Sequence, residues 1–543
     1  MKHANRALRL LTLFLCALML VPLVCGINPG QSSADAASPI GNTVRVGLSV
    51  PELGTAVFLS SAISESGFSI GTYNGETFLP LFSTASTSLA LFPDRNVQVN
   101  FKDDGTANGC ALDNGNFGSY SIRTEQFYTD YQTARSAADK IDGFVAFVEG
   151  GFEVRYGSFA TESDAQSAVA KAGHTVASPA KGGLVVADCN TGKRLLEYER
   201  SDMLALRAKD GGEVSLNNYS GRKSYLGFFA FSAPSYMKVI NVLDLELYVK
   251  CVMANEIGTN VSVETRRVFS VLIRTVPMNR KHDKYGMDVC NTECCQVYLG
   301  TFRRDAENDA IVDSTKGEYI TYQGTPINCL YHSSNGGASC SSVAAWGGTE
   351  IPYLTSVTLG ENGDNPGEVW QYTFTKDELY AFLSGRNEFS GLAGSISDVT
   401  IDATDPYGSG YVTALSVTDR FGSKITVETS EVIRRALRFE SANFTITYET
   451  NADILTADGV KEDSSVGGYL DANGVYHTFD SFEEYDIAGT DDKMSADRIV
   501  FDGVGTGHGV GLSSVGSEQL VGEGYSYRYI IAFYFRGTEI SKV

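Results

Sequence analysis

One short loop constrains this chain more than any other segment, because it gathers four side chains that bind soft metal ions. His282, Cys290, Cys294 and Cys295 lie within 14 residues of one another. Disulfides are the alternative, but the adjacent Cys294 and Cys295 could bond to each other only with strain, or each to a distant partner. Four soft ligands in one loop suit tetrahedral Zn²⁺. The spacing therefore favours a structural zinc site over disulfides.

The N-terminus indicates the compartment. Lys2, Arg6 and Arg9 precede an apolar run over 10–27, and small residues follow up to Ala37. This is the layout of an export signal over 1–37, and an uncleaved membrane anchor is the alternative. We therefore expect an exported protein that acts in the cell wall or on the extracellular face of the membrane.

Eight of the ten cysteines lie beyond residue 37, and in an exported chain an even count is typical of disulfides. Cys329 and Cys340 flank a turn-rich stretch and fit either a hairpin disulfide or two buried thiols. The sequence leaves both alternatives open.

Charge and composition exclude some classes of function. Asp and Glu number 65 against 43 Lys and Arg, which gives a net charge of -22. Such an acidic chain is a poor partner for nucleic acid, because a diffuse basic surface is lacking. A hydrophobic content of 43% is too high for a disordered chain, and 543 residues allow two to four folded units.

A βαββαβ pattern is predicted over 115–190. Strands are expected at 120–122, 144–148, 152–156 and 183–186, with helices at 125–141 and 161–172. The stretch from Val154 to Phe159, followed by an Ala-rich helix, resembles the SPOR domain, a small module that binds peptide-free peptidoglycan glycan. The resemblance implies glycan contacts from Arg155, Tyr156 and Phe159. An ordinary ferredoxin-like unit is the alternative.

Two helices are predicted next to the most informative motifs. A buried strand over 237–243 precedes Asp244, which can cap a helix whose apolar residues recur at helical spacing and which places Glu256 just past its end. A second helix fits 263–275 and is closed by Pro277. Strands are expected again at 319–322 and 328–331.

Seven motifs in order resemble the stage II sporulation protein D family, whose members are also described as LytB-like or amidase-enhancer proteins. They are Val239-Ile240-Asn241-Val242-Leu243 with Leu245-Glu246-Leu247-Tyr248-Val249; Asn255-Glu256; Arg274-Thr275; Asp288-Val289-Cys290 with Cys295-Gln296-Val297-Tyr298; Tyr331-His332-Ser333-Ser334-Asn335-Gly336-Gly337; Trp346-Gly347; and Gly507-His508-Gly509-Val510-Gly511-Leu512-Ser513. The resemblance implies a lytic transglycosylase that acts on peptide-free glycan, and zinc in the loop from His282 to Cys295. It also implies substrate contacts from part of these motifs, namely Tyr248, Arg274, His332, Ser333, Ser334, His508 and Ser513.

Glu256 is the predicted catalytic residue. Protonation of a glycosidic oxygen at neutral pH needs a carboxylic acid in apolar surroundings, and Val252, Met253 and Ile257 are near in sequence. A hydrolase would need a second carboxylate. A transglycosylase needs only one, because the C6 hydroxyl of the sugar attacks C1 and one Glu serves as acid and then as base.

Histidines lie in two of the motifs. His508 stands among glycines that let the backbone approach a ligand, and we predict that it contacts sugar or orients Glu256. His332, with Ser333 and Ser334, could hydrogen-bond acetamido or hydroxyl groups. A Ser–His catalytic pair is the rival, but adjacent residues of an extended segment point to opposite sides.

The chain departs from the family in four places. The family typically has Ser-Glu-Met-Pro around the acid, and here the residues are Asn255-Glu256-Ile257-Gly258. Phe269 and Ser514 stand where Gln is usual, and Cys294 replaces a common His. The last change keeps a competent zinc ligand, which makes a Cys₃His site.

The predicted fold class is α+β: a mostly β catalytic core with a few helices, and an inserted ferredoxin-like module. We assign 43–110 to the N-terminal strands of the core, 115–190 to the SPOR-like module and 191–543 to the catalytic domain. The function expected is cleavage of peptide-free glycan strands to 1,6-anhydro products during cell-wall remodelling, of which sporulation is one setting. A non-catalytic glycan-binding protein that stimulates a peptidoglycan amidase is the alternative, and an exported adhesin is a third.

Overall fold

The computed structural model describes residues 42–55, 57–98, 116–218, 221–257, 259–279, 282–292, 294–359, 369–449 and 498–543, together with four short strands between 454 and 478. The predicted export segment, 1–37, lies outside the described residues. Within them, the chain is mostly sheet with some helix, so the predicted α+β class is confirmed. No described helix has both the length and the apolar character needed to cross a membrane.

A seven-stranded sheet supports the candidate site. Its strands, in spatial order, are β19 (Val289–Cys290), β1 (Thr43–Ser49), β18 (Lys238–Asp244), β17 (Phe228–Ser232), β14 (Met203–Ala208), β3 (Phe68–Tyr73) and β4 (Phe78–Thr84). Strand β1 pairs antiparallel with β18 and parallel with β19. Strand β18, which precedes the helix predicted after Asp244, and strand β19, which carries Cys290, therefore lie on either side of β1.

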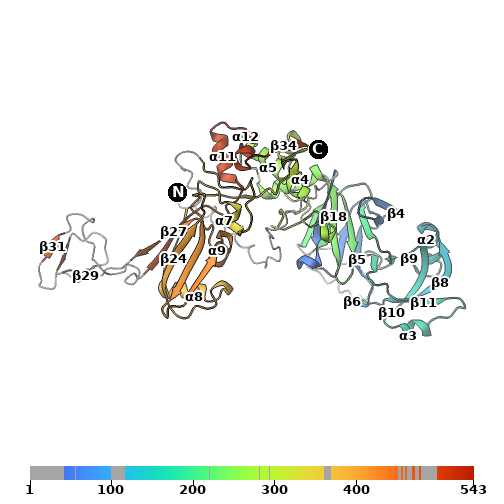
Figure 1. Ribbon diagram of the computed structural model, residues 1–543. Helices are drawn as coiled ribbons and strands as arrows, with labels where there is room; N and C mark the ends of the chain where they lie inside the picture. The colour runs from blue at the N-terminus through green and yellow to red at the C-terminus, as the bar shows by residue number, and fades with distance from the viewer. Residues whose placement is uncertain are drawn as a thin grey trace.

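A ten-stranded sheet contains the βαββαβ segment. Its strands, in spatial order, are β11 (Thr175–Ala177), β8 (Tyr120–Tyr128), β10 (Gly151–Phe159), β9 (Phe144–Val148), β13 (Arg194–Tyr198), β12 (Leu184–Asp188), β5 (Ser88–Pro93), β2 (Ser60–Ile63), β15 (Val214–Asn218) and β16 (Gly221–Tyr225). Helices α2 (Tyr131–Asp139) and α3 (Glu162–Ser167) lie between these strands in the chain. Figure 1 shows this segment at the end of the molecule beyond β5.

The structure corrects three boundaries in that segment. The first strand continues to Tyr128 and Asp130 caps the helix, so the helix predicted from residue 125 starts late. The second helix ends at Ser167. The strand predicted at 183–186 is β12, which pairs with β5 and β13; the segment's own last strand is β11. Sequence periodicity does not reveal such long-range pairing.

Five helices form a layer next to the seven-stranded sheet. They are α4 (Leu245–Glu256), α5 (Val263–Thr275), α6 (Ala306–Ser314), α11 (Ser514–Gly522) and α12 (Tyr527–Tyr534). Helix α5 packs against the other four. A small sheet packs against this layer through contacts of its middle strand with α5, and it includes the C-terminal strand. Its strands, in spatial order, are β21 (Thr325–Pro326), β20 (Glu318–Tyr322) and β34 (Glu539–Lys542).

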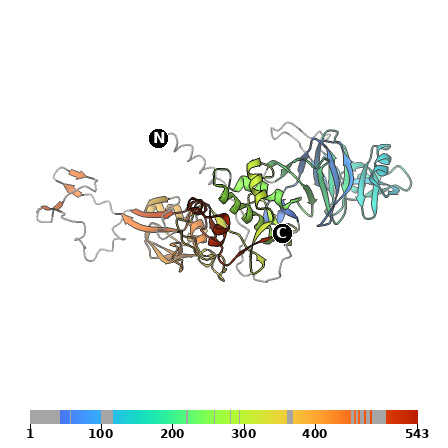
Figure 2. The ribbon, with the colours of Figure 1, turned by 90° about the horizontal axis from the view of Figure 1, so that it is seen from above.

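A second hydrophobic core lies within the predicted catalytic domain. Trp370, Leu415 and Phe501 are among its buried residues. Its elements are β23 (Val369–Thr375), β32 (Arg498–Val504), β27 (Phe444–Glu449), β24 (Ile396–Thr404), β25 (Val412–Asp419), β26 (Lys424–Glu428), α8 (Lys376–Leu383) and α9 (Ser430–Leu437). Figures 1 and 2 place these elements on the opposite side of the helical layer from the large sheets. The sequence did not predict this separate core.

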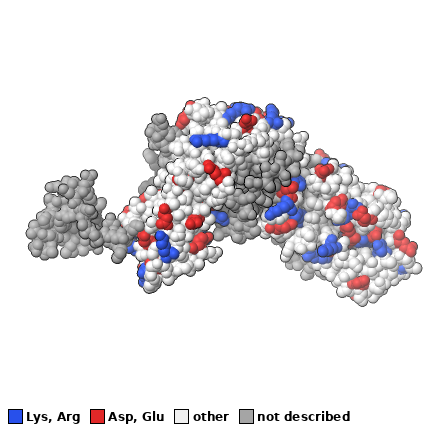
Figure 3. Space-filling view, viewed as in Figure 1, with Lys and Arg blue, Asp and Glu red and all other residues white. Residues whose placement is uncertain are grey.

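The remaining described elements are short. They are the strands β6 (Val97–Gln98), β7 (Asn116–Phe117), β22 (Tyr331–His332), β28 (Ile454–Thr456), β29 (Gly459–Lys461), β30 (Gly468–Leu470), β31 (Tyr476–Thr478) and β33 (Leu512–Ser513), the helix α7 (Ser342–Trp346), and four 3-10 turns. The strand predicted over 328–331 is thus only β22. On the face that Figure 3 shows, acidic and basic side chains of the described residues are interspersed.

Candidate active site and metal centre

Helices α4 and α5 position Glu256. Asp244 caps α4 by accepting a hydrogen bond from the Leu247 N–H at 3.1 Å, as predicted, and Glu256 is the last residue of this helix rather than the one after it. Ser262 caps α5, and its hydroxyl donates to the Glu518 carboxylate of α11 at 2.7 Å. The loop that follows Glu256 is therefore anchored at its far end.

Two donors hold the Glu256 carboxyl group. The Val297 N–H donates to Oε1 at 2.6 Å. The Tyr331 phenol hydrogen-bonds the same carboxyl group, and burial, followed by the Glu256 charge, raises the pKa of Tyr331. The surroundings of Glu256 are thus less apolar than its neighbours in sequence suggested, because two distant segments direct hydrogen-bond donors at it.

Tyr331 is a site residue that the sequence reasoning missed, although it stands in a quoted motif. Its hydroxyl accepts a hydrogen bond from the side-chain amide nitrogen of Gln296 at 3.4 Å. The side-chain amide oxygen of Gln296 accepts one from the Tyr248 hydroxyl at 2.9 Å. Phe269, which replaces the usual Gln, packs edge-on against the Tyr331 ring, with the centroids 5.2 Å apart. A chain of side chains therefore fixes the phenol that faces Glu256.

His332, which follows Tyr331 on β22, lies next to His508. Strands β22 and β33 pair in parallel, and the two imidazole rings are 5.5 Å apart, with Trp346 5.5 Å from His508. Gly507 permits this approach, because a Cβ there would lie 2.9 Å from the Cβ of His332. His508 also hydrogen-bonds the backbone of Tyr331. This contact links His508 to the residue that holds Glu256.

His332 is buried and His508 is partly buried, and the surroundings of both imidazoles disfavour the charged form. His332 Nδ1 lies 3.2 Å from the Val510 carbonyl, and His508 Nδ1 accepts from the Val510 N–H at 3.0 Å. Burial, and then the neighbouring His508, lowers the pKa of His332 to about 3; burial, and then Arg434, lowers the pKa of His508 to about 4. Among the described residues, nothing bonds to His332 Nε2, so one acceptor faces inward without a partner.

This burial predicts an acid-sensitive region. The folded pKa of His332 is below its unfolded value, so the stabilisation is complete above about pH 6.5 and is lost as the pH falls from there toward 3, because the unfolded chain takes up the proton first. At pH 5 we expect a loss of about 2 kcal/mol from this residue. Urea unfolding at pH 7 and pH 5 measures it, and His332→Gln should reduce the difference. An equal difference in wild type and variant would refute the assignment.

Several predicted contact residues are held inside the protein. Arg274 is fully buried and makes two hydrogen bonds, at 2.8 and 2.7 Å, with Glu246. Tyr248 is fully buried against Gln296, Ser513 caps α11, and Ser334 is buried and pairs through its backbone with Thr506. These four side chains are buried and engaged in contacts within the protein, whereas Ser333 is exposed. The sequence could not separate the two roles, because both kinds of residue lie in the same motifs.

The SPOR-like segment shows a similar correction. Arg155 is 4% exposed and forms ion pairs with Glu153, Glu197 and Glu199. Its guanidinium is therefore engaged across β9 and does not meet glycan. Tyr156, which bonds His174 at 3.0 Å, and Phe159 are partly exposed.

The four predicted metal ligands come together. The donor atoms of His282, Cys290, Cys294 and Cys295 all lie within 4.8 Å of one another, and Cys294 Sγ is 3.5 Å from His282 Nε2. A tetrahedron of ligands at about 2.3 Å from Zn²⁺ needs sulfur atoms about 3.8 Å apart, so the donor set and its spacing fit this ion. The histidine and the three cysteines are each wholly or partly buried.

The metal loop is tied both to the sheet and to Glu256. Cys290 lies on β19, beside Gly47 of β1, and Asp288 pairs with Arg45 at 2.7 Å. Immediately after Cys295 come Gln296 and Val297, which hold Tyr331 and Glu256. The metal loop and the residues that contact Tyr331 and Glu256 are therefore consecutive in the chain.

The other cysteines resolve the open alternative. Cys329 and Cys340 are buried free thiols, and burial raises the pKa of each. Cys189 is disulfide-bonded.

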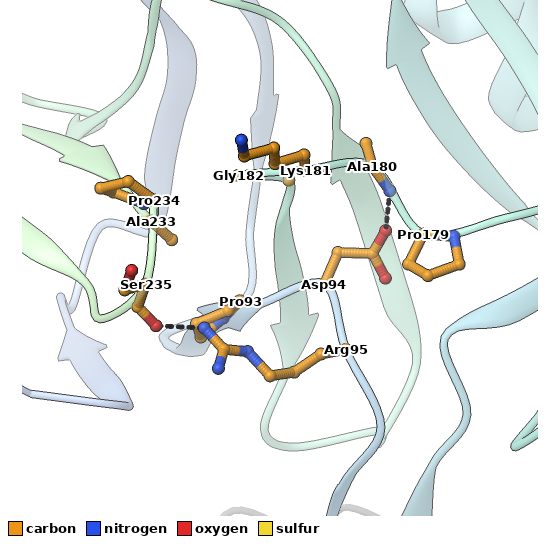
Figure 4. A pocket seen from close by; sticks show the side chains of 11 residues that line it. Pro93, Asp94, Arg95, Pro179, Ala180, Lys181, Gly182, Ala233, Pro234 and Ser235 are labelled. Carbon is orange, nitrogen blue, oxygen red and sulfur yellow. Dashed lines mark hydrogen bonds between the residues drawn. The ribbon is translucent and has the colours of Figure 1, made fainter.

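A separate cavity of about 440 Å³ lies between the loops at 93–95, 179–183 and 233–235 (Figure 4). The Asp94 carboxylate accepts from the Ala180 N–H at 3.3 Å, Arg95 bonds the Ser235 carbonyl, and burial raises the pKa of Asp94 to about 7. None of the predicted site residues lines this cavity. The cavity is therefore separate from the candidate site around Glu256.

Comparison with known proteins agrees with this geometry. Residues 234–322 match the family model described as Stage II sporulation protein, a range that contains Glu256, α4, α5 and all four metal-loop residues. The chain thus carries a stage II sporulation protein domain, and the family resemblance predicted from the motifs is confirmed. The SPOR-like resemblance stays a prediction.

Two proteins of known name are similar to this chain over a longer range. The chain is 24% identical over 381 residues to the amidase enhancer of Bacillus subtilis (strain 168), an alignment that covers 67% of this chain and 50% of that protein. It is also 24% identical over 318 residues to the stage II sporulation protein D of the same organism, covering 55% of this chain and 75% of that protein. The match thus spans only half the length of the amidase enhancer.

Proposed function

We propose that this chain is an exported lytic transglycosylase that cleaves peptide-free peptidoglycan glycan to 1,6-anhydro products, with Glu256 as the catalytic residue. The observation that carries the proposal is the position of Glu256 at the end of α4, held by the Val297 N–H and the Tyr331 phenol. A side chain fixed at two points is preorganised to meet one glycosidic oxygen. The stage II sporulation protein domain around it supports the same chemistry.

The reaction needs one carboxyl group. Protonated Glu256 gives its proton to the glycosidic oxygen as the C1–O bond breaks. The C6 hydroxyl of the same muramic residue attacks C1, and the Glu256 carboxylate accepts the proton from that hydroxyl. The acid is thereby regenerated and no water is consumed. Tyr331 and Val297 position the carboxyl group throughout.

Zinc is proposed as a structural ion. His282, Cys290, Cys294 and Cys295 would fill all four tetrahedral positions, so no position would be left for water or substrate. The bound ion would contribute folding free energy and rigidity to the loop that ends in Gln296 and Val297.

A second function has its own support. The amidase enhancer of Bacillus subtilis is among the relatives, and Asn255, Ile257 and Gly258 depart from the family's usual residues around the acid. A non-catalytic protein that binds glycan and stimulates a peptidoglycan amidase would need a glycan-binding surface but not the acid. Product analysis with and without an amidase separates the two functions.

The SPOR-like segment is proposed to bind peptide-free glycan through Tyr156 and Phe159. Deleting the whole of 115–190 would not test this, because β12 lies between β5 and β13 and its loss would break the ten-stranded sheet. Point variants are the appropriate test.

We expect Tyr156→Ala with Phe159→Ala to weaken binding to amidase-treated sacculi, measured by sedimentation, about thirtyfold, since two stacked aromatic contacts are each worth about 1 kcal/mol. Cleavage of short soluble glycans should be retained. Phe421→Ala, at a residue 67% exposed in the turn between β25 and β26, is the matched control. Unchanged sedimentation of the double variant would leave the segment as a structural part of the sheet.

A further inference from the structure

An exposed aromatic side chain stands on the segment that follows the metal loop. Phe302 is 48% exposed. Thr301 ties this segment to β16, because its N–H and hydroxyl donate to the Ser224 carbonyl at 2.9 and 3.2 Å. Gly300 permits the approach, with φ of 67° and no room for a Cβ, which would lie 2.0 Å from the same carbonyl. Strand β16 thereby brings Lys223 beside Phe302.

Two cations rest on the Phe302 ring. Lys223 Nζ lies 5.6 Å and the Arg303 guanidinium carbon 5.1 Å from the ring centroid. Neither forms an ion pair with an acidic group in the described part of the chain, whereas the adjacent Arg304 is neutralised by Asp309 at 2.7 Å. An aromatic ring attracts a cation without cancelling its charge. The pair is therefore a fixed positive site in a chain whose net charge is -22.

This positive site stands on a segment that contacts Glu256 and its neighbour Asn255. The segment that begins with Val297, the donor to Glu256, continues to Phe302, whose carbonyl accepts from the Asn255 side chain at 3.4 Å. Arg303 has a φ of 62°, a left-handed conformation that costs a non-glycine residue free energy. Its side chain is therefore placed here at the expense of backbone strain.

We infer that Lys223 and Arg303, held on Phe302, form an anion subsite that selects muramic residues with a free lactyl carboxylate. The inference rests on the proposed function and names the residues that give it substrate selectivity. In a peptide-free strand the lactyl group ends in a carboxylate, whereas an attached stem peptide converts that group to a neutral amide. Two unneutralised cations favour the first form, since charge-assisted hydrogen bonds are stronger than neutral ones.

Binding in the absence of cleavage tests the subsite. The parent protein is Glu256→Gln, and the probes are peptide-free glycan oligosaccharides and the same oligosaccharides with every lactyl carboxylate converted to a methylamide. We expect the parent to prefer the carboxylate form about tenfold in titration calorimetry at low salt. Adding Lys223→Gln and Arg303→Gln should remove that preference without weakening binding of the methylamide form.

The controls separate charge from folding. Lys209→Gln with Arg435→Gln removes two exposed cations elsewhere and should keep the preference. Lys223→Arg with Arg303→Lys should restore it, and thermal unfolding checks that each variant is folded.

Equal affinity of the parent for the two probes, no binding of either probe, or an undiminished preference after Lys223→Gln and Arg303→Gln would each overturn the subsite. No step of this test requires turnover. A carboxylate preference in the parent, together with a wild type that releases no anhydro products, would therefore reject the transglycosylase proposal and keep the subsite.

Discussion

Replacing Glu256 by Gln is expected to abolish the release of 1,6-anhydro products, with a loss of at least about 10³-fold in rate. The amide cannot give a proton to the leaving oxygen, and it cannot accept one from the C6 hydroxyl. The side-chain oxygen can still accept from the Val297 N–H, so the fold should be preserved. The rate is measured by chromatography of products from purified peptide-free glycan, and the fold by thermal unfolding.

A matched control and a neighbouring variant sharpen this result. Glu523→Gln changes an exposed acid at the end of α11 and should leave the rate unchanged. Tyr331→Phe removes the phenol that holds Glu256, and should lower kcat by about tenfold and change its pH profile while KM is kept. Full activity of Glu256→Gln would eliminate the proposed mechanism.

Loss of a metal ligand is expected to have the second large effect. Cys290→Ala should bind no zinc and should unfold at least about 5 °C below the wild type, because the folding free energy supplied by a structural site is lost. Activity should fall with it, since Gln296 and Val297 follow the loop directly. Elemental analysis and thermal scans measure the two effects, and chelation of the wild type should reproduce them.

Cys340→Ala provides the comparison, because Cys340 is a buried free thiol outside the loop. That variant should keep one zinc ion per chain even where truncation lowers its stability. Carefully purified wild type without zinc, with Cys294 and Cys295 oxidised to disulfides, would contradict the metal assignment.

Local signals in the sequence were sufficient for α4, α5 and the metal loop. Asp244 and apolar residues at helical spacing predicted α4, and four soft ligands within one loop predicted a cluster that the folded chain brings together. Both predictions depend on neighbours in the sequence, so they required no knowledge of how distant strands pair.

Features that depend on contacts between distant parts of the chain could not be predicted from the sequence. Tyr331 reaches Glu256 from 75 positions away in the chain. Arg155 and Arg274 stand in motifs that resemble binding sites. In the folded protein both are buried, and both form ion pairs with carboxylates from other elements. Strand β12 has the same local pattern as a last strand of the SPOR-like segment, and only its pairing with β5 and β13 shows that it lies elsewhere in the ten-stranded sheet.

Mass spectrometry of the products from purified peptide-free glycan tests the central claim most directly. The proposed reaction consumes no water, so the new muramic ends should be 1,6-anhydro sugars, each lighter by one water than a hydrolysed end, and they should be absent with Glu256→Gln. Reducing ends in their place would indicate a hydrolase. Intact glycan, together with faster release of peptides when an amidase is added, would contradict the transglycosylase and support the enhancer.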